Sequence, residues 1–192
     1  MAPSRPHATI FVITGPSGVG KGTLIAALRA RHPELGLSIS ATTRSPRPGE
    51  QDGVDYHFVS ELQFDERLAA GEFVEHATYA GHRYGTLRAE LDRRTGGGEP
   101  VVLEIEVQGA RQVRDAIAAA ILVFIAPPSL AVLRDRLEAR GTDDAQDIAM
   151  RIAVAETELA ACAEFPHTIV NDDLDRAIDA LDALYTRARA AP

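Results

Sequence analysis

The sequence has 192 residues, of which 45 % are hydrophobic and 25 % charged, a composition typical of a globular protein and too apolar for a disordered one. With 20 Lys and Arg against 28 Asp and Glu, the net charge of −8 argues against a protein that coats nucleic acid or anionic membrane. The length favours one domain, and a single cysteine cannot form an internal disulfide. No apolar run reaches the roughly 18 residues of a membrane helix and no signal peptide is recognisable. We therefore expect a cytoplasmic protein without nucleic-acid, membrane or obligate protein partners.

Short β-branched and aromatic runs alternate along the chain with helical stretches. Residues 10–13 predict a buried strand, and the helix that follows it is limited by Pro33. Further buried strands are predicted at 101–105, 121–125 and 168–170, and helices at 110–120, 130–140 and 145–163. Apolar residues at positions 174, 178, 181 and 185 predict a final helix. This alternation predicts an α/β fold whose parallel sheet carries helices on both faces.

Residues 37–98 follow another pattern and indicate an inserted α+β lobe. Short strands are predicted at 37–40, 56–59 and 73–79, and one helix at about 60–70. Ser60 is its expected cap, because Gln63 follows three residues later as in a capping box. The single domain therefore divides into a core of about residues 8–36, 99–128 and 164–192 and a lobe of about 37–98.

A glycine-rich loop follows the first predicted strand and matches the first seven positions of the phosphate-binding pattern G-x-x-x-x-G-K-[ST]. It consists of Gly15, Pro16, Ser17, Gly18, Val19, Gly20 and Lys21. Glycines let backbone N–H groups converge on phosphate oxygens, and the lysine reaches the outer phosphates. Gly22 stands where the pattern has a hydroxyl, which comes one residue later at Thr23. Whether Thr23 or only water approaches Mg²⁺ stays open, and a plain glycine turn is the alternative to a nucleotide site.

Several segments, taken in order, resemble the guanylate kinase family. They are residues 38–50, 53–58, 71–75, 84–86, 103–109, 136–141 and 169–174. The resemblance implies a P-loop kinase core, a GMP-binding lobe and a helical lid at about 129–163. It also implies Mg²⁺-dependent transfer of the γ-phosphate of ATP to GMP, giving ADP and GDP, in purine nucleotide metabolism.

The same resemblance implies a GMP pocket in the lobe. Its phosphate-binding residues would be Ser40, Arg44, Arg47 and Tyr56, with Tyr84 as a further phosphate contact. Planar guanidinium groups suit this task because they bind phosphate through two parallel hydrogen bonds. Glu75 and Thr86 would read guanine, since a carboxylate accepts from N1 and N2 and a hydroxyl donates to O6. Adenine lacks those donors and would leave Glu75 unpaired. On their own, the arginines also fit a solvated surface loop and the tyrosines a small core.

Glu104 and Glu106 end a predicted buried strand, where alternation sends both to one face. This is the position at which related kinases place a carboxylate toward Mg²⁺. We expect Glu106 to serve Mg²⁺, directly or through water, or the GMP side. Glu104 either shares that role or serves only structure.

The lid implied by the resemblance contains three arginines, Arg136, Arg140 and Arg151. Together with Lys21 they would stabilise charge on the transferring phosphate, as an arginine finger does in cis. Ion pairs on the helix surface are the alternative for each of them. Asn171, after the last predicted strand, would contact the adenine-side loop.

Two other functions compete with a guanylate kinase. A non-catalytic binding module with the same fold is disfavoured because the loop glycines and Lys21 are intact. A kinase for another small phosphorylated acceptor is disfavoured by Glu75 and Thr86, which suit guanine.

Overall fold

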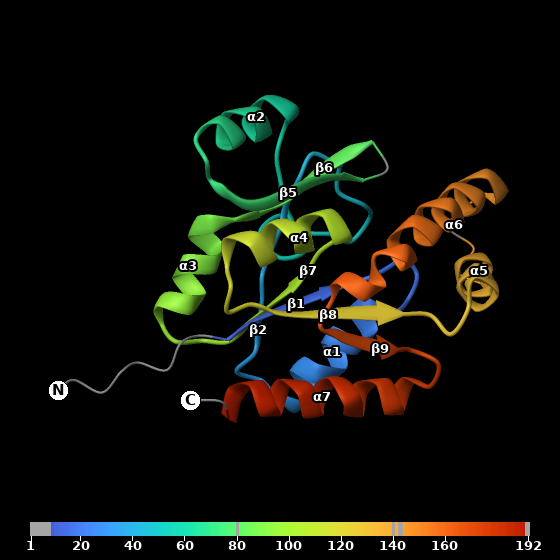
Figure 1. The fold of residues 1–192 in the computed structure, drawn as a ribbon. Coiled ribbons are helices and arrows are strands. Elements are labelled where there is room, and N and C mark those ends of the chain that lie inside the picture. Colours follow the sequence, from blue (N-terminus) through green and yellow to red (C-terminus); the bar gives the residue numbers. More distant parts are fainter. Residues whose placement is uncertain (1–8, 80, 140, 142–143, 191–192) are drawn as a thin grey trace.

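The computed structural model describes residues 9–79, 81–139, 141 and 144–190. At its centre lies a sheet of five parallel strands in the order β2-β7-β1-β8-β9 (Figure 1). The strands are β1 (Ile10–Thr14), β2 (Gly36–Leu37), β7 (Val101–Glu104), β8 (Ile121–Ala126) and β9 (His167–Val170). The predicted α/β fold with a parallel sheet is therefore confirmed.

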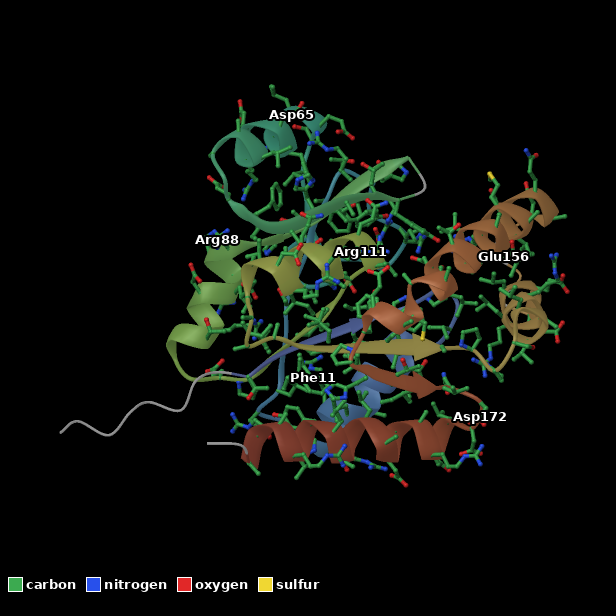
Figure 2. All side chains as sticks on the ribbon, in the orientation of Figure 1. Phe11, Asp65, Arg88, Arg111, Glu156 and Asp172 are labelled. Atoms are coloured by element: carbon green, nitrogen blue, oxygen red, sulfur yellow. The ribbon has the colours of Figure 1, made fainter. Side chains whose placement is uncertain are left out.

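Helices cover both faces of this sheet. Successive strand residues point to opposite faces, and because these residues are apolar, both faces must be buried. Phe11 and Ile13 of β1 enter one apolar cluster, together with α1 (Lys21–Arg31) and α7 (Leu174–Ala190). Val12, between them, enters the other cluster, which contains α4 (Val107–Ala116). Phe11 lies between the sheet and α7, where its ring meets the ring of Tyr185 edge-on at 5.7 Å (Figure 2). With both faces buried, ligand chemistry in a parallel sheet of this kind takes place beyond the carboxyl ends of the strands.

A second sheet forms the lobe, with four strands in the order β4-β3-β6-β5. The strands are β3 (Ala41–Thr42), β4 (His57–Phe58), β5 (Phe73–Tyr79) and β6 (His82–Leu87), and the lobe helices are α2 (Glu61–Ala69) and α3 (Arg88–Gly96). Phe64 stacks on Phe73 with ring centroids 4.4 Å apart in a small core of its own. Ser60 and Gln63 form the predicted capping box at the start of α2.

Three elements lie between β8 and β9. They are α5 (Leu130–Ala139), α6 (Ala145–Ala160) and a short 3-10 helix, η1 (Cys162–Glu164). The helices α5 and α6 pack against each other beside the carboxyl end of the sheet (Figure 1). None of the helices in the described part of the chain is long and apolar enough to cross a membrane.

The structure corrects several predicted boundaries. The predicted strand at 37–40 is wrong as a lobe strand, because Leu37 pairs with Val102 in the core sheet. The strands β3 and β6 and the helix α3 were not predicted. The helix α4 starts at Val107 rather than at residue 110 and ends at Ala116, because Ile117 leaves the helical region at φ −134°. The alanines at 118–120 have high helix propensity and led to the longer predicted helix. In the structure, Ile117 and Ala120 instead pack against the apolar core.

The lobe is fastened to the core where the edge strand β5 meets α4. Val74 of β5 joins the apolar cluster of α4. The side chain of Gln112 bridges the two elements, accepting from the backbone N–H of His76 at 3.1 Å and donating to its carbonyl at 2.6 Å. An amide side chain thus takes the place of a neighbouring strand. This contact holds the lobe above the carboxyl ends of the core strands.

Candidate active site

A cleft of about 850 Å³ lies between the glycine-rich loop and the lobe. Parallel α/β sheets bind ligands at this edge, beyond the carboxyl ends of their strands. Most of the predicted site residues line the cleft: Gly15, Ser17, Gly18, Gly20, Lys21, Gly22, Thr23, Ser40, Arg44, Arg47, Tyr56, Glu75, Tyr84, Glu106 and Arg151. Residues that lie far apart in the sequence therefore meet in one place.

The loop between β1 and α1 has a backbone that its glycines make possible. Gly15 has φ +134°, and a β-carbon there would lie 2.2 Å from the carbonyl oxygen of Ile125. Gly20 has φ +99° directly before the first residue of α1, Lys21. Side chains at either position would be strained or would clash. The loop therefore turns its backbone toward the cleft at the N-terminus of a helix, the geometry that suits phosphate.

The Lys21 ammonium lies over this loop and donates to the carbonyls of Gly15, at 2.6 Å, and Pro16, at 3.1 Å. Arg151 of α6 reaches the same loop and donates to the Ser17 hydroxyl at 2.9 Å. Two cationic side chains, one from α1 and one from α6, therefore contact the loop. Pro16 and Val19 belong to the loop but are not among the residues that line the cleft, and Val19 is fully buried.

Asn171 and Arg136 lie behind the loop rather than in the cleft. The Asn171 amide donates to the Val19 carbonyl at 2.8 Å, and its side chain is buried. Arg136 of α5 donates to the carbonyl of Asn171 at 2.8 Å and to that of Val19 at 3.4 Å. Both residues therefore clamp the backbone of the loop. Arg140, the third arginine predicted for the lid, lies outside the described residues.

In the lobe, one carboxylate organises both predicted phosphate-binding arginines. Glu50 Oε1 pairs with the Arg44 guanidinium at 2.8 Å, and Oε2 accepts from the backbone N–H of Arg47 at 2.7 Å. Arg44 also lies 5.4 Å from the ring centroid of Tyr56, which meets Tyr84 at 6.0 Å. The Arg44 guanidinium holds the pKa of Glu50 below its usual range. The Arg44 side chain is therefore held in place by Glu50, whereas at Arg47 this contact fixes only the backbone of an exposed residue.

Glu75 is the most deeply buried carboxylate of the cleft, with 3 % of its surface exposed. Its Oε1 accepts from the Thr86 backbone N–H at 2.9 Å and from the Thr86 hydroxyl at 2.7 Å. Burial raises the pKa of Glu75, while these two hydrogen bonds lower it. Thr86 itself is fully buried and does not line the cleft. A fixed carboxylate remains, presented to any ligand that offers N–H donors.

Two further carboxylates of the cleft, Glu106 and Glu158, lie within electrostatic reach of Lys21. Burial and repulsion by Glu75 and Glu158 raise the pKa of Glu106 to about 7, while Lys21 opposes the shift. Burial also raises the pKa of Glu158. Two half-buried carboxylates within reach of one ammonium, with Glu75 close to Glu106, make this end of the cleft attractive to positive charge.

The donors at this end of the cleft fit a magnesium ion. Mg²⁺ prefers oxygen ligands and is held in kinases by one or two carboxylates together with substrate phosphates. Glu104, Glu106 and the Thr23 hydroxyl supply such oxygens, and all three line the cleft. Glu104 faces the first turn of α1, since a β-carbon at Gly22 would lie 3.7 Å from its Oε2. The prediction that Glu106 lies on the same strand as Glu104 is wrong. The strand β7 ends at Glu104, and Glu106 is the residue that directly precedes α4.

Sequence reasoning did not identify Tyr79, His82 or Glu158 as cleft residues, although all three line it. A signal was available for each. Tyr79 lies four residues after Glu75 on the same face of β5, and His82 lies two residues before Tyr84 on β6. Glu158 follows Arg151 by two helical turns of α6 and therefore shares its face.

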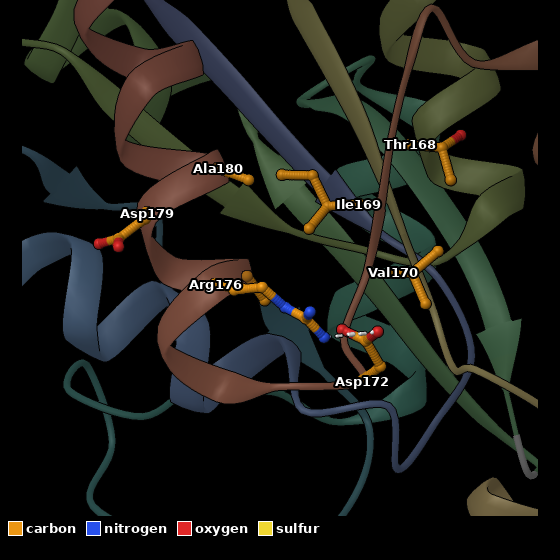
Figure 3. A pocket seen from close by; sticks show the side chains of 8 residues that line it. Thr168, Ile169, Val170, Asp172, Arg176, Asp179 and Ala180 are labelled. Atoms are coloured by element: carbon orange, nitrogen blue, oxygen red, sulfur yellow. Dashed lines mark hydrogen bonds and ion pairs between the residues drawn. The ribbon is translucent and has the colours of Figure 1, made fainter.

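A second hollow, of about 400 Å³, lies between β9 and α7 (Figure 3). Its charged side chains include Arg176 and Asp172, which pair with each other at 2.8 Å. None of the predicted site residues is among the described residues that line it. The predicted chemistry therefore belongs to the cleft of the lobe.

Comparison with known proteins bears directly on this cleft. The family model described as guanylate kinase matches residues 7–188. The chain belongs to the guanylate kinase family. It is 57 % identical over 180 residues to a guanylate kinase of Thermosynechococcus vestitus, covering 93 % of this chain and 94 % of that protein. It is 56 % identical over 175 residues to a guanylate kinase of Frankia casuarinae, covering 91 % of this chain and 95 % of the other.

The fold agrees with this relationship. The crystal structure of a guanylate kinase from Anaplasma phagocytophilum superimposes with a TM-score of 0.79 at 28 % identity. The match covers 97 % of this chain and 89 % of the other. The predicted family and the predicted P-loop kinase architecture are both confirmed.

Proposed function

We propose that the cleft is where this guanylate kinase transfers the γ-phosphate of ATP to GMP, with Mg²⁺ as cofactor and with the residue roles given below. Phosphorylation of GMP to GDP with ATP is the activity that follows from membership of the family. One observation supports the roles above all. A phosphate-binding loop and a buried carboxylate fixed by Thr86 line the same cleft. We propose the cytoplasm as the site of action.

In this proposal the loop of residues 15–21 holds the ATP phosphates. Its backbone N–H groups and the N-terminus of α1 supply partial positive charge, and Lys21 supplies a full one. To do so, Lys21 exchanges its bonds to the Gly15 and Pro16 carbonyls for phosphate oxygens. Thr23, Glu104 and Glu106 would hold Mg²⁺, directly or through water. When bound, this ion neutralises charge on the phosphates.

The lobe, residues 37–98, binds GMP. Its phosphate lies against Ser40, Arg44, Arg47, Tyr56 and Tyr84, all of which line the cleft. Glu75 accepts hydrogen bonds from the N1 and N2 groups of guanine, which adenine cannot supply. Thr86 has a different role from the predicted direct contact with O6. Its hydroxyl already donates to Glu75, so we propose that Thr86 positions the Glu75 carboxylate that recognises guanine.

An oxygen of the GMP phosphate, already anionic, attacks the γ-phosphorus of ATP. A new P–O bond forms, the bond between that phosphorus and the bridging oxygen breaks, and ADP departs with the electron pair. No general base is needed, because positioning and charge neutralisation lower the barrier. Lys21 and Arg151 flank the reacting phosphates, and the lid of residues 129–163 closes to exclude water.

A coupled assay of ADP release tests the substrate. The protein is incubated with ATP and Mg²⁺ and with GMP, AMP, CMP, UMP or dTMP in turn. Rapid turnover with GMP alone is expected. Equal turnover with AMP would contradict the proposed reading of guanine, and retained GMP binding without turnover with any nucleotide would favour a binding module.

The Glu75→Gln variant tests the base reader. A neutral amide presents one donor to the guanine edge where two acceptors are needed, so kcat/KM for GMP should fall by about 10-fold or more. The KM for ATP should stay within about twofold. Glu72→Gln, an exposed carboxylate of the same lobe, is the matched control. Equal losses toward both nucleotides would remove Glu75 from base recognition.

A further inference from the structure

Gly109, the third residue of α4, lies directly against the carboxylate of Glu75. A β-carbon at this position would lie 2.2 Å from Glu75 Oε2 and 2.9 Å from its carboxyl carbon. Non-bonded carbon and oxygen atoms normally approach to roughly 3.5 Å. Any side chain at position 109 would therefore require the carboxylate to move by roughly 1 Å.

The helix cannot make this room by moving away from β5. Gln112, one turn after Gly109, is bonded to both backbone groups of His76, the residue next to Glu75. Between them on α4, Ala110 is fully buried, and Val113 one turn later is buried as well. A retreat of α4 would break two hydrogen bonds and open the core.

The carboxylate is therefore the part that yields. Among the described residues, the hydrogen bonds to Glu75 reach Oε1, from the backbone N–H and the hydroxyl of Thr86, and Oε2 is the atom turned toward Gly109. Because the displaced group is the end of a flexible side chain, the fold should tolerate its movement. Recognition should not, since hydrogen bonds to a base weaken steeply when distance and angle change.

We propose that Gly109 is a positioning residue for substrate choice: its missing side chain leaves the space in which Glu75 lies and so sets the preference for guanine over adenine. The inference rests on the proposed role of Glu75 as the base reader. Gly109 touches no substrate in this scheme and acts only through Glu75.

The first test compares Gly109→Ala with Gly96→Ala. Both glycines lie in helices, but a β-carbon at Gly96 meets nothing within 4 Å. For Gly109→Ala we expect kcat/KM with GMP to fall by about 10-fold, mainly through KM, and the preference for GMP over AMP to fall with it. KM for ATP and Tm should match those of Gly96→Ala. Unchanged selectivity, or equal losses toward GMP and ATP, would overturn the proposal.

A double-mutant cycle separates positioning from packing. Glu75→Asp shortens the side chain by one methylene and withdraws the carboxylate from position 109. In that background Gly109→Ala should change kcat/KM for GMP by less than about twofold, against about 10-fold in the wild type. Equal losses in both backgrounds would show that Gly109 serves packing alone and would overturn the proposal.

The kinetics of the two single variants distinguish the role of Glu75 from that of Gly109. If Glu75→Asp alone leaves guanine selectivity intact, the proposed base reader fails and the positioning of Glu75 by Gly109 falls with it. If Glu75→Asp loses selectivity while Gly109→Ala keeps it, the base reader stands and only the inference on Gly109 is overturned.

Discussion

Glu75 and Thr86 face each other across the β5–β6 pair, and one oxygen of Glu75 accepts both the backbone N–H and the hydroxyl of Thr86. The pairing follows an irregularity in the register between Phe73 and Glu75. Such irregularities re-aim side chains next to functional sites. Here the result is a carboxylate held in a buried place where its desolvation is opposed by two hydrogen bonds.

This relationship predicts the effect of Thr86→Val, which keeps the shape and removes the hydroxyl. Oε1 of Glu75 would retain only the backbone N–H as donor, so the carboxylate would be both less fixed and less easily ionised. We expect KM for GMP to rise by about 5- to 10-fold and Tm to fall slightly.

Thr86→Ser restores the hydroxyl and should restore KM, which makes it the matched control. If Thr86→Val and Thr86→Ser behave alike, the hydroxyl does not hold Glu75. Steady-state kinetics with GMP as the varied substrate distinguish the two results.

Glu50→Gln tests the organisation of the phosphate-binding arginines. The amide keeps one acceptor but loses the charge that holds Arg44 and the second acceptor that receives the Arg47 N–H. We expect KM for GMP to rise by about 3- to 10-fold with little change in kcat. Glu66→Gln, at an exposed position of α2, is the control, and a loss confined to kcat would contradict this role for Glu50.

Lys21 is the only lysine in the sequence, which allows a direct observation of its role. Reductive methylation with ¹³C-formaldehyde keeps the positive charge and labels Lys21 and the terminal amine alone. The Lys21 resonance should shift on addition of ATP, because the ammonium exchanges its carbonyl partners for phosphate. GMP alone should leave it in place.

Lys21→Ala provides the kinetic counterpart. Removing a charge that stabilises the transferring phosphate should lower kcat by about 100-fold or more. Tm should change little, because the side chain is only half-buried. Near-normal kcat would remove Lys21 from the mechanism.

Asn171 was predicted to contact the adenine-side loop, whereas the structure places its amide on the Val19 carbonyl behind the phosphate loop. The two roles predict different losses in Asn171→Ala. A clamp on the loop should weaken ATP and inorganic tripolyphosphate alike, by about 10-fold. A contact on the adenine side should weaken ATP only, and competitive binding of the two ligands measures the difference.

The sequence was sufficient to predict the elements that are determined by one local pattern. Residues 10–13 followed by glycines and Lys21 predict a strand, a phosphate loop and a helix, and all three are present. Ser60 and Gln63 predict the start of α2 for the same reason, since a capping box is complete within four residues.

The sequence was insufficient where tertiary contacts decide. The local sequence around Leu37 is compatible with a short strand of either sheet. Only the pairing of Leu37 with Val102 assigns this strand to the core. The burial of Glu75 and the proximity of Gly109 to Glu75 depend on how the lobe docks on α4, and the direction of the Asn171 amide depends on how the segment after β9 packs against the phosphate loop. No spacing within the chain encodes these distances.

Glu158 should make the folding stability of the protein depend on pH. It lies on α6, its Oε2 has no hydrogen-bond partner among the residues that the structure describes, and burial raises its pKa. A carboxyl whose pKa is higher in the folded than in the unfolded protein favours folding below the unfolded value. That contribution disappears as the pH rises from about 4.5 through the folded pKa.

Glu158→Gln removes the charge and keeps the shape. The ligand-free variant should therefore gain stability over the wild type as the pH rises, by on the order of 1 kcal/mol at pH 8, and should show no such gain at pH 4.5. Urea unfolding at a series of pH values measures this, with the exposed Glu156→Gln of the same helix as control. Since Lys21 lowers the pKa of Glu158, the opposite trend would mean that their attraction outweighs the cost of burial.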